Sequence, residues 1–203
     1  SRGLGDVYKR QVEDQGDAFS DLLMLFGLIV ILVYIVMATQ FESLKFPFII
    51  MFTIPFAFTG VFVALWMTST PLSLIALIGA IMLVGIVTKN GIVMVDYMNL
   101  LIERGAGVFD AVIAGGKSRL RPVLMTSFTT ILGMVPLAIG TGAGSETWQP
   151  MGIAVIGGLT CSTILTLFIV PALYSVMVNR SQRKERQRIA KLQASHQADN
   201  FNK

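Results

Sequence analysis

A lone lysine inside a long apolar run, Lys89, is the residue best placed to carry chemistry. In a helix that ends near Asn99, it lies about ten residues from the end, so its ammonium is about 15 Å deep, near the bilayer middle. A lysine at that depth costs about 2.5 to 3.5 kcal/mol, so we expect it to face other helices and to pair with a carboxylate. Asp96 shares its face but lies about 10 Å further along the axis, nearer the interface. Asn90 is adjacent and points elsewhere.

The missing counter-ion predicts carboxylates on a helix outside this chain, or a lysine that is deprotonated. The alternative is that Lys89 extends toward the headgroups and that Asp96 is simply solvated.

Arg119 and Thr126 form a second pair, seven residues apart on either side of Pro122. If one helix continues through Pro122, Thr126 lies above Arg119 on one face, and the two side chains form a polar track. The alternatives are that Arg119 only anchors the topology and that the Thr126 hydroxyl bonds a backbone carbonyl one turn back.

The composition excludes a soluble globular domain. The chain is 54% hydrophobic and 14% charged, with a mean hydropathy of +0.70, whereas soluble chains are roughly 25% charged. Charged residues are absent between Asp21 and Glu42, between Lys45 and Lys89, and on both sides of Glu146 as far as Arg121 and Arg180. These gaps are long enough for membrane helices, which need about 20 apolar residues each.

The charge-free gaps predict an all-α membrane protein with five transmembrane helices, near 22–39, 46–67, 72–99, 122–139 and 151–177. We expect a kink at Pro55, a late break at Pro171 and a brief surface helix over 108–114. Residues 1–21 are interpreted as a non-membrane stretch, of which 1–11 could be foreign to the protein. Residues 22–178 form the transmembrane domain, and 179–203 form a basic tail.

Basic residues lie in the first connection, as Lys45 alone, in the third connection and in the tail, whereas the second and fourth connections contain none. Because such residues stay on the cytoplasmic side of short loops, we expect the carboxyl terminus to be cytoplasmic. The net charge of +4 is therefore attributed to topology and not to nucleic-acid binding. Ala154, Gly158 and Ser162 recur every four positions, which predicts a close helix-packing face.

The sequence gives little support for an enzyme active site or for a metal site. No nucleophile stands beside a base, and no paired carboxylates occur at reaction-ready spacing. The single cysteine, Cys161, and the single histidine, His196, lie apart. The glycine-rich segment 140–144 precedes an apolar span and lacks the following lysine of a phosphate loop. We expect no cofactor and no bound metal.

Two motifs resemble the resistance-nodulation-division efflux transporters. The first is Gly-Ile-Val-Thr-Lys-Asn over 85–90, continuing to Asp96, and the second is Gly-Lys-Ser-Arg-Leu-Arg-Pro over 116–122, continuing to Thr126 and Ser127. Gln-Phe-Glu-Ser over 40–43 and Gly-Ala-Gly-Ser over 142–145 fit the same pattern, so the match covers about 21–180. Lys89 followed by Asn90 looks more like the hydrophobe/amphiphile branch than the heavy-metal branch.

The resemblance implies that the five helices are the last of a twelve-helix bundle, in an inner-membrane trimer driven by proton influx. It implies a periplasmic adaptor and an outer-membrane channel as partners, with amphiphilic drugs as substrates. By the resemblance, Lys89 pairs with two aspartates of the other half, Arg119 and Thr126 join the proton relay, and Asp96 and Asn90 are weaker candidates. The alternatives are an exporter of another substrate, and a non-transporting scaffold that docks a partner helix through Lys89.

Overall fold

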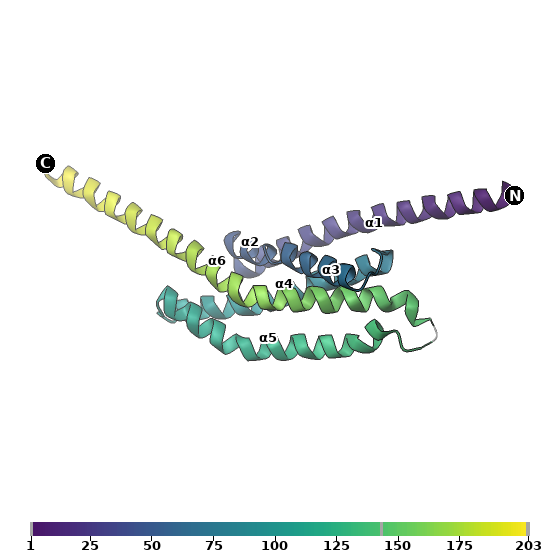
Figure 1. Cartoon of the computed structure of the whole chain (residues 1–203). Helices are drawn as coiled ribbons and strands as arrows, with labels where there is room; N and C mark the ends of the chain where they lie inside the picture. The colour runs from purple at the N-terminus through teal and green to yellow at the C-terminus, as the bar shows by residue number, and fades with distance from the viewer. Residues whose placement is uncertain (1, 143, 202–203) are drawn as a thin grey trace.

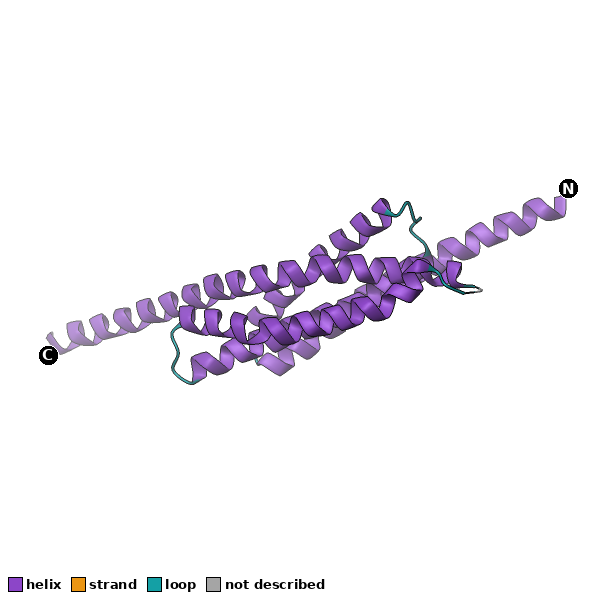
Figure 2. Ribbon diagram, turned by 60° about the horizontal axis from the view of Figure 1, so that its bottom comes forward, coloured by secondary structure: helices purple, strands orange, loops and turns teal. Residues whose placement is uncertain are grey.

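The protein is an assembly of long helices. The structure, a computed structural model, describes the backbone of residues 2–142 and 144–201, and side chains for most of residues 9–180. The described residues contain helices and loops but no strand (Figure 2). The helices are α1 (Arg2–Phe41), α2 (Lys45–Met51), α3 (Ile54–Met67), α4 (Leu74–Glu103), α5 (Val108–Ile139) and α6 (Ser145–Phe201).

Five segments are long and apolar enough to cross a membrane, which confirms the predicted number of spans. They are Val12–Phe41, Lys45–Met67, Leu74–Glu103, Val108–Ile139 and Ser145–Arg180. Each extends past its predicted bounds at one end or both, whereas the third span begins two residues later than predicted, at Leu74. The two ends of the chain project from opposite ends of the bundle (Figure 1).

The second span is divided into α2 and α3, and the cause is Pro55. A proline has no N–H, and its ring clashes with the carbonyl four residues earlier. That carbonyl belongs to Met51, where α2 ends. Thr53 then closes a tighter turn, with its N–H donating to the Ile50 carbonyl at 3.0 Å. The kink expected at Pro55 is therefore a complete break one turn upstream.

α5 differs from the expected brief surface helix followed by a span that begins at Pro122. It is one helix from Val108, with Pro122 in its interior. Pro122 is exposed, so its ring points away from the face of α5 that lies along α4 and α6, and the helix is continuous through it. α6 likewise continues through Pro171, where a break was expected, and only bends along its length (Figure 1).

The core lies where α4 and α6 cross the other helices. One buried cluster joins α3, α4 and α6 around Leu83 and Leu159, and a second joins α1, α2, α4 and α6 around Met94 and Tyr174. In the most apolar stretch of α4 and of α6, half or more of the residues are buried inside the bundle. The corresponding share is 6% in the first span and 11% in α5. α1 and α5 are therefore peripheral within this chain.

Close helix crossings depend on small residues in α6. Ala154, Gly158 and Ser162 are all buried. A Cβ on Gly158 would collide with the side chain of Leu83 on α4, and would lie 2.8 Å from Cγ2 of Val61 on α3. Glycine at this position lets three helices meet closely in an apolar environment.

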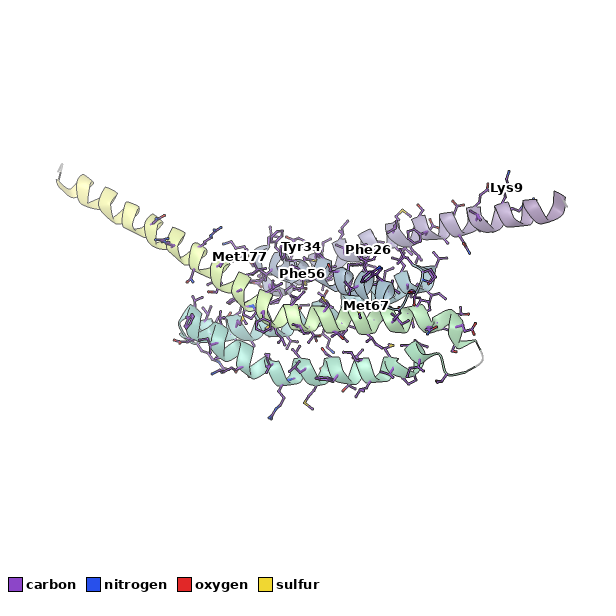
Figure 3. All side chains as sticks on the ribbon, in the orientation of Figure 1. Lys9, Phe26, Tyr34, Phe56, Met67 and Met177 are labelled. Atoms are coloured by element: carbon purple, nitrogen blue, oxygen red, sulfur yellow. The ribbon has the colours of Figure 1, made fainter. Side chains whose placement is uncertain are left out.

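An apolar groove of about 510 Å³ lies between α1 and the broken span. Phe26, labelled in Figure 3, reaches from α1 toward α3, where its ring meets Phe58 edge-on at a centroid distance of 5.1 Å. The groove is lined by Phe26, Val30, Met51, Ile54, Pro55, Phe58, Thr59 and Phe62.

Candidate functional site

One face of α4 is left uncovered by the other helices of this chain, and Lys89 lies on it. The residues of this face are three, four or seven positions apart, as one face of a helix requires. They are all exposed: Ile78, Met82, Gly85, Lys89, Asp96 and Leu100. Lys89 stands midway along this 30-residue helix, about 21 Å from its nearer end at about 1.5 Å of rise per residue. It lies farther from the helix end than expected, because α4 continues past Asn99 to Glu103.

Lys89 forms no ion pair with any described residue. Asp96 lies two turns away on the same face, at a cavity of about 280 Å³ between the ends of α1 and α4. The lining residues of that cavity are Gln40, Phe41, Glu42, Asp96, Asn99, Leu100 and Glu103. The structure therefore separates Asp96 from Lys89 and places it among other acidic groups.

Asn90 faces the opposite way from Lys89. It is only 8% exposed, because consecutive residues of a helix are about 100° apart. Its neighbour Thr88 is also buried and donates its hydroxyl to the Val84 carbonyl at 2.6 Å. The structure does not bring Asn90 and Lys89 into one site.

Arg119 lies on the packed face of α5 and contacts α4. Its guanidinium carbon is 4.6 Å from the ring centroid of Tyr97, within the range of about 6 Å in which a cation is attracted to an aromatic face. Its Nε is buried and has no acceptor among the described residues. Arg119 is therefore held by an aromatic ring, and one of its N–H donors is left unpaired.

Thr126 is exposed on α5, and its hydroxyl donates to the Pro122 carbonyl at 2.8 Å. The Met98 side chain fills the space beside Gly115, which fixes how α5 runs back along α4. Because α5 runs antiparallel to α4, each residue further along α5 lies beside a residue one position earlier on α4. Counted from the contact of Gly115 with Met98, Thr126 lies beside Val87 of α4. Counted from the contact of Arg119 with Tyr97, it lies beside Asn90. The two levels bracket Lys89, so Thr126 and Lys89 lie at a similar depth.

Two polar contacts inside the bundle were not predicted. The Ser127 hydroxyl of α5 lies 2.8 Å from the Thr163 hydroxyl of α6, and the buried Tyr174 hydroxyl donates to Asn99 Oδ1. The signal that could have found them is a polar residue on the inward face of an apolar span, where a partner is needed. The Tyr97 contact carries no such signal, because an aromatic residue near a span end is ordinary.

Within the part of the chain that the structure describes, no group of three His, Cys, Asp or Glu residues could hold a metal ion. The polar groups are instead a mid-span ammonium, a half-buried guanidinium and hydroxyls at intermediate depth. Ionisable groups at such depths are typical of ion and proton pathways through membrane proteins. The fold and these groups define a multi-pass α-helical membrane protein with an ionisable face in one of its spans.

The chain belongs to the AcrB/AcrD/AcrF family, whose members are resistance-nodulation-division transporters: the family model matches residues 2–178. Similar curated proteins include the cobalt-zinc-cadmium resistance protein CzcA of Cupriavidus metallidurans, 37% identical over 92% of this chain. The multidrug resistance protein MdtC of Erwinia tasmaniensis is 43% identical over 71% of this chain.

A solved structure of a heavy metal efflux pump is also similar, with a TM-score of 0.76 and 32% sequence identity over 83% of this chain. The chain spans 18% of the length of CzcA, 14% of MdtC and 16% of that pump. The similarity therefore concerns the membrane spans, and the relatives are efflux transporters and not enzymes.

Proposed function

We propose that this chain is the carboxyl-terminal transmembrane part of an efflux permease that exchanges protons for amphiphilic drugs across the bacterial inner membrane. The observation that carries the proposal is Lys89, a mid-span cation on the uncovered face of α4 with no ion pair among the described residues. A cation at that depth needs a carboxylate partner, and the family resemblance supplies a pair of aspartates from a helix of the other half.

The proposed mechanism is a change of partner at Lys89. Proton entry neutralises the aspartates, Lys89 loses its counter-ion, and the helices around α4 shift. Arg119 and Thr126 belong to the same proton relay, which the similar depth of Thr126 and Lys89 supports. Asp96, at the acidic cavity near the end of α4, and the inward Asn90 are the weaker candidates for this relay.

The assembly proposed for the permease is a homotrimer that joins a periplasmic adaptor and an outer-membrane channel. Its carboxyl terminus lies in the cytoplasm, which the basic residues of the tail support.

The test is drug resistance conferred by the complete open reading frame that contains this chain, expressed in a pump-deficient bacterial host. Lys89→Ala is expected to reduce the inhibitory drug concentration to that of the empty host, with membrane expression unchanged. The matched control is Lys117→Ala, an exposed lysine ten residues into α5, which is expected to keep resistance. Resistance that survives in Lys89→Ala would contradict the proposal.

Metal export is the second candidate, because CzcA at 37% identity and the heavy metal pump at a TM-score of 0.76 are among the similar proteins. The same strains decide between the two substrate classes when they are challenged with cobalt, zinc and cadmium salts. Metal resistance without drug resistance, again abolished by Lys89→Ala, would favour the metal exporter.

A scaffold that only docks a partner helix through Lys89 is the third candidate. Proton movement distinguishes this candidate from a transporter, because a scaffold moves no protons across the membrane when substrate is added to energised vesicles. Substrate-dependent proton flux that disappears in Lys89→Ala would exclude the scaffold.

A further inference from the structure

The contact between Arg119 and Tyr97 joins α5 to α4 near one end of the bundle. The guanidinium carbon lies 4.6 Å from the ring centroid, and both residues are half-buried. Tyr97 is eight residues beyond Lys89 on α4, about 12 Å along the axis at about 1.5 Å per residue. The contact therefore lies between the mid-span lysine and the end of the helix.

The ring is the only polar or electrostatic contact of Arg119 among the described residues. Its Nε is buried without an acceptor, although a guanidinium has donors in a fixed planar arrangement. An unpaired buried donor is costly, and more so on a charged group. The guanidinium is thus held over the Tyr97 ring, and its Nε–H stays available to an acceptor that arrives from elsewhere.

The nearby carboxylates do not orient Arg119. Asp96 is adjacent to Tyr97 but faces the cavity that it shares with Glu42 and Glu103. None of these three carboxylates forms an ion pair with Arg119 in the described part of the chain. The planar face of the guanidinium is suited to an aromatic ring, and a lysine in its place would stack less well.

We propose that Tyr97 is a positioning residue for Arg119, holding its guanidinium across the α4–α5 boundary so that Nε–H points to an incoming acceptor. This proposal rests on the proposed function, in which Arg119 belongs to the proton relay. The ring face, and not the Tyr97 hydroxyl, does the positioning.

The first test measures substrate-driven proton flux in vesicles that contain the complete permease. Tyr97→Leu is expected to lower the maximal rate about three- to tenfold, the range that the loss of a partly desolvated cation–π contact implies. The substrate concentration at half-maximal rate stays unchanged, because substrate binding does not involve this contact. Tyr97→Phe keeps the ring and is expected to keep the rate.

The matched control is Phe128→Leu, which removes an exposed aromatic ring from α5 and is expected to leave the maximal rate unchanged. Equal loss in Tyr97→Phe and Tyr97→Leu, or no loss in Tyr97→Leu, would overturn the proposal. A raised half-saturation concentration with an unchanged maximal rate would also overturn it.

A second test does not depend on transport. Phenylglyoxal modifies arginine side chains, and peptide mass spectrometry measures its reaction at Arg119 against the exposed Arg121 in the same molecule. Tyr97→Leu is expected to raise the reactivity of Arg119 relative to Arg121, whereas Tyr97→Phe is not. If Lys89→Ala leaves transport intact, the proposed function fails, and this reaction still decides the contact: an unchanged reactivity ratio in Tyr97→Leu overturns it.

Discussion

Gly60 of α3 and Gly157 of α6 meet backbone to backbone: a Cβ on Gly60 would lie 2.7 Å from the carbonyl oxygen of Gly157. A Cβ on Gly157 would in turn lie 2.9 Å from the carbonyl oxygen of Gly60. Neither contact can be relieved by moving a flexible side chain. The pair therefore sets how closely α3 approaches α6.

Gly60→Val is expected to destabilise the protein by about 3 kcal/mol, the upper part of the range for overpacking, because backbone atoms must move. The measurement is thermal unfolding of the purified protein in detergent. Gly133→Val is the matched control, since nothing lies within 4 Å of a Cβ at Gly133. Equal unfolding temperatures for the two variants would show that the glycine crossing is unimportant.

Tyr174→Phe is expected to destabilise the protein by about 1 to 2 kcal/mol, because it removes a buried hydrogen bond and leaves Asn99 without its partner. The Tyr174 side chain is 0% exposed, and its hydroxyl donates to Asn99 Oδ1. Tyr34→Phe is the control, because the Tyr34 hydroxyl donates to the Leu44 carbonyl at 3.3 Å in an exposed position. The two unfolding temperatures are compared, and a larger loss in Tyr34→Phe would contradict the prediction.

The Ser127 and Thr163 hydroxyls are expected to be coupled by about 0.6 kcal/mol, the average for hydrogen bonds between membrane helices. A double-mutant cycle with Ser127→Ala and Thr163→Val measures this energy. Thr160→Val replaces the second partner in the control cycle, because the Thr160 hydroxyl donates to its own helix at the Ile156 carbonyl. Additive effects in the first cycle would show that the hydroxyl pair is not coupled.

The orientation of the chain is expected to follow its basic residues. In a Cys161→Ser background, a cysteine at Ser69 or Thr141 is expected to react with a membrane-impermeant maleimide in intact cells. A cysteine at Arg183 is expected to react only after the cells are opened. If only Arg183→Cys were labelled in intact cells, the topology would be the inverse of the one expected.

The spans were predictable because soluble domains rarely contain a charge-free gap long enough to cross a bilayer. The ends of the helices were less predictable, because the polar residues before Asp21 and after Arg180 continue α1 and α6. Proline did not have one meaning. Pro55 ends α2 one turn upstream, whereas Pro122 and Pro171 lie inside continuous helices.

Lys89 was identifiable as a candidate because its sequence position places it far from both ends of a span, where an unpaired lysine is costly. The partner of Arg119 was not, because Tyr97 and Arg119 lie on different helices, and their meeting depends on how α4 packs on α5. Within one helix, periodicity shows which residues share a face. Between helices, contacts such as Ser127 with Thr163 need the register that only the packed structure defines.

The uncovered face of α4 has a consequence for biogenesis. While that face is open, Lys89 has no carboxylate among the described residues, so the newly inserted bundle carries the cost of an unpaired cation, about 2.5 to 3.5 kcal/mol at a span centre. A helix bearing carboxylates that packed against the face would remove that cost. Under the proposed function, the same lysine would penalise bundles that lack this helix, and it would distinguish incomplete assemblies from complete ones.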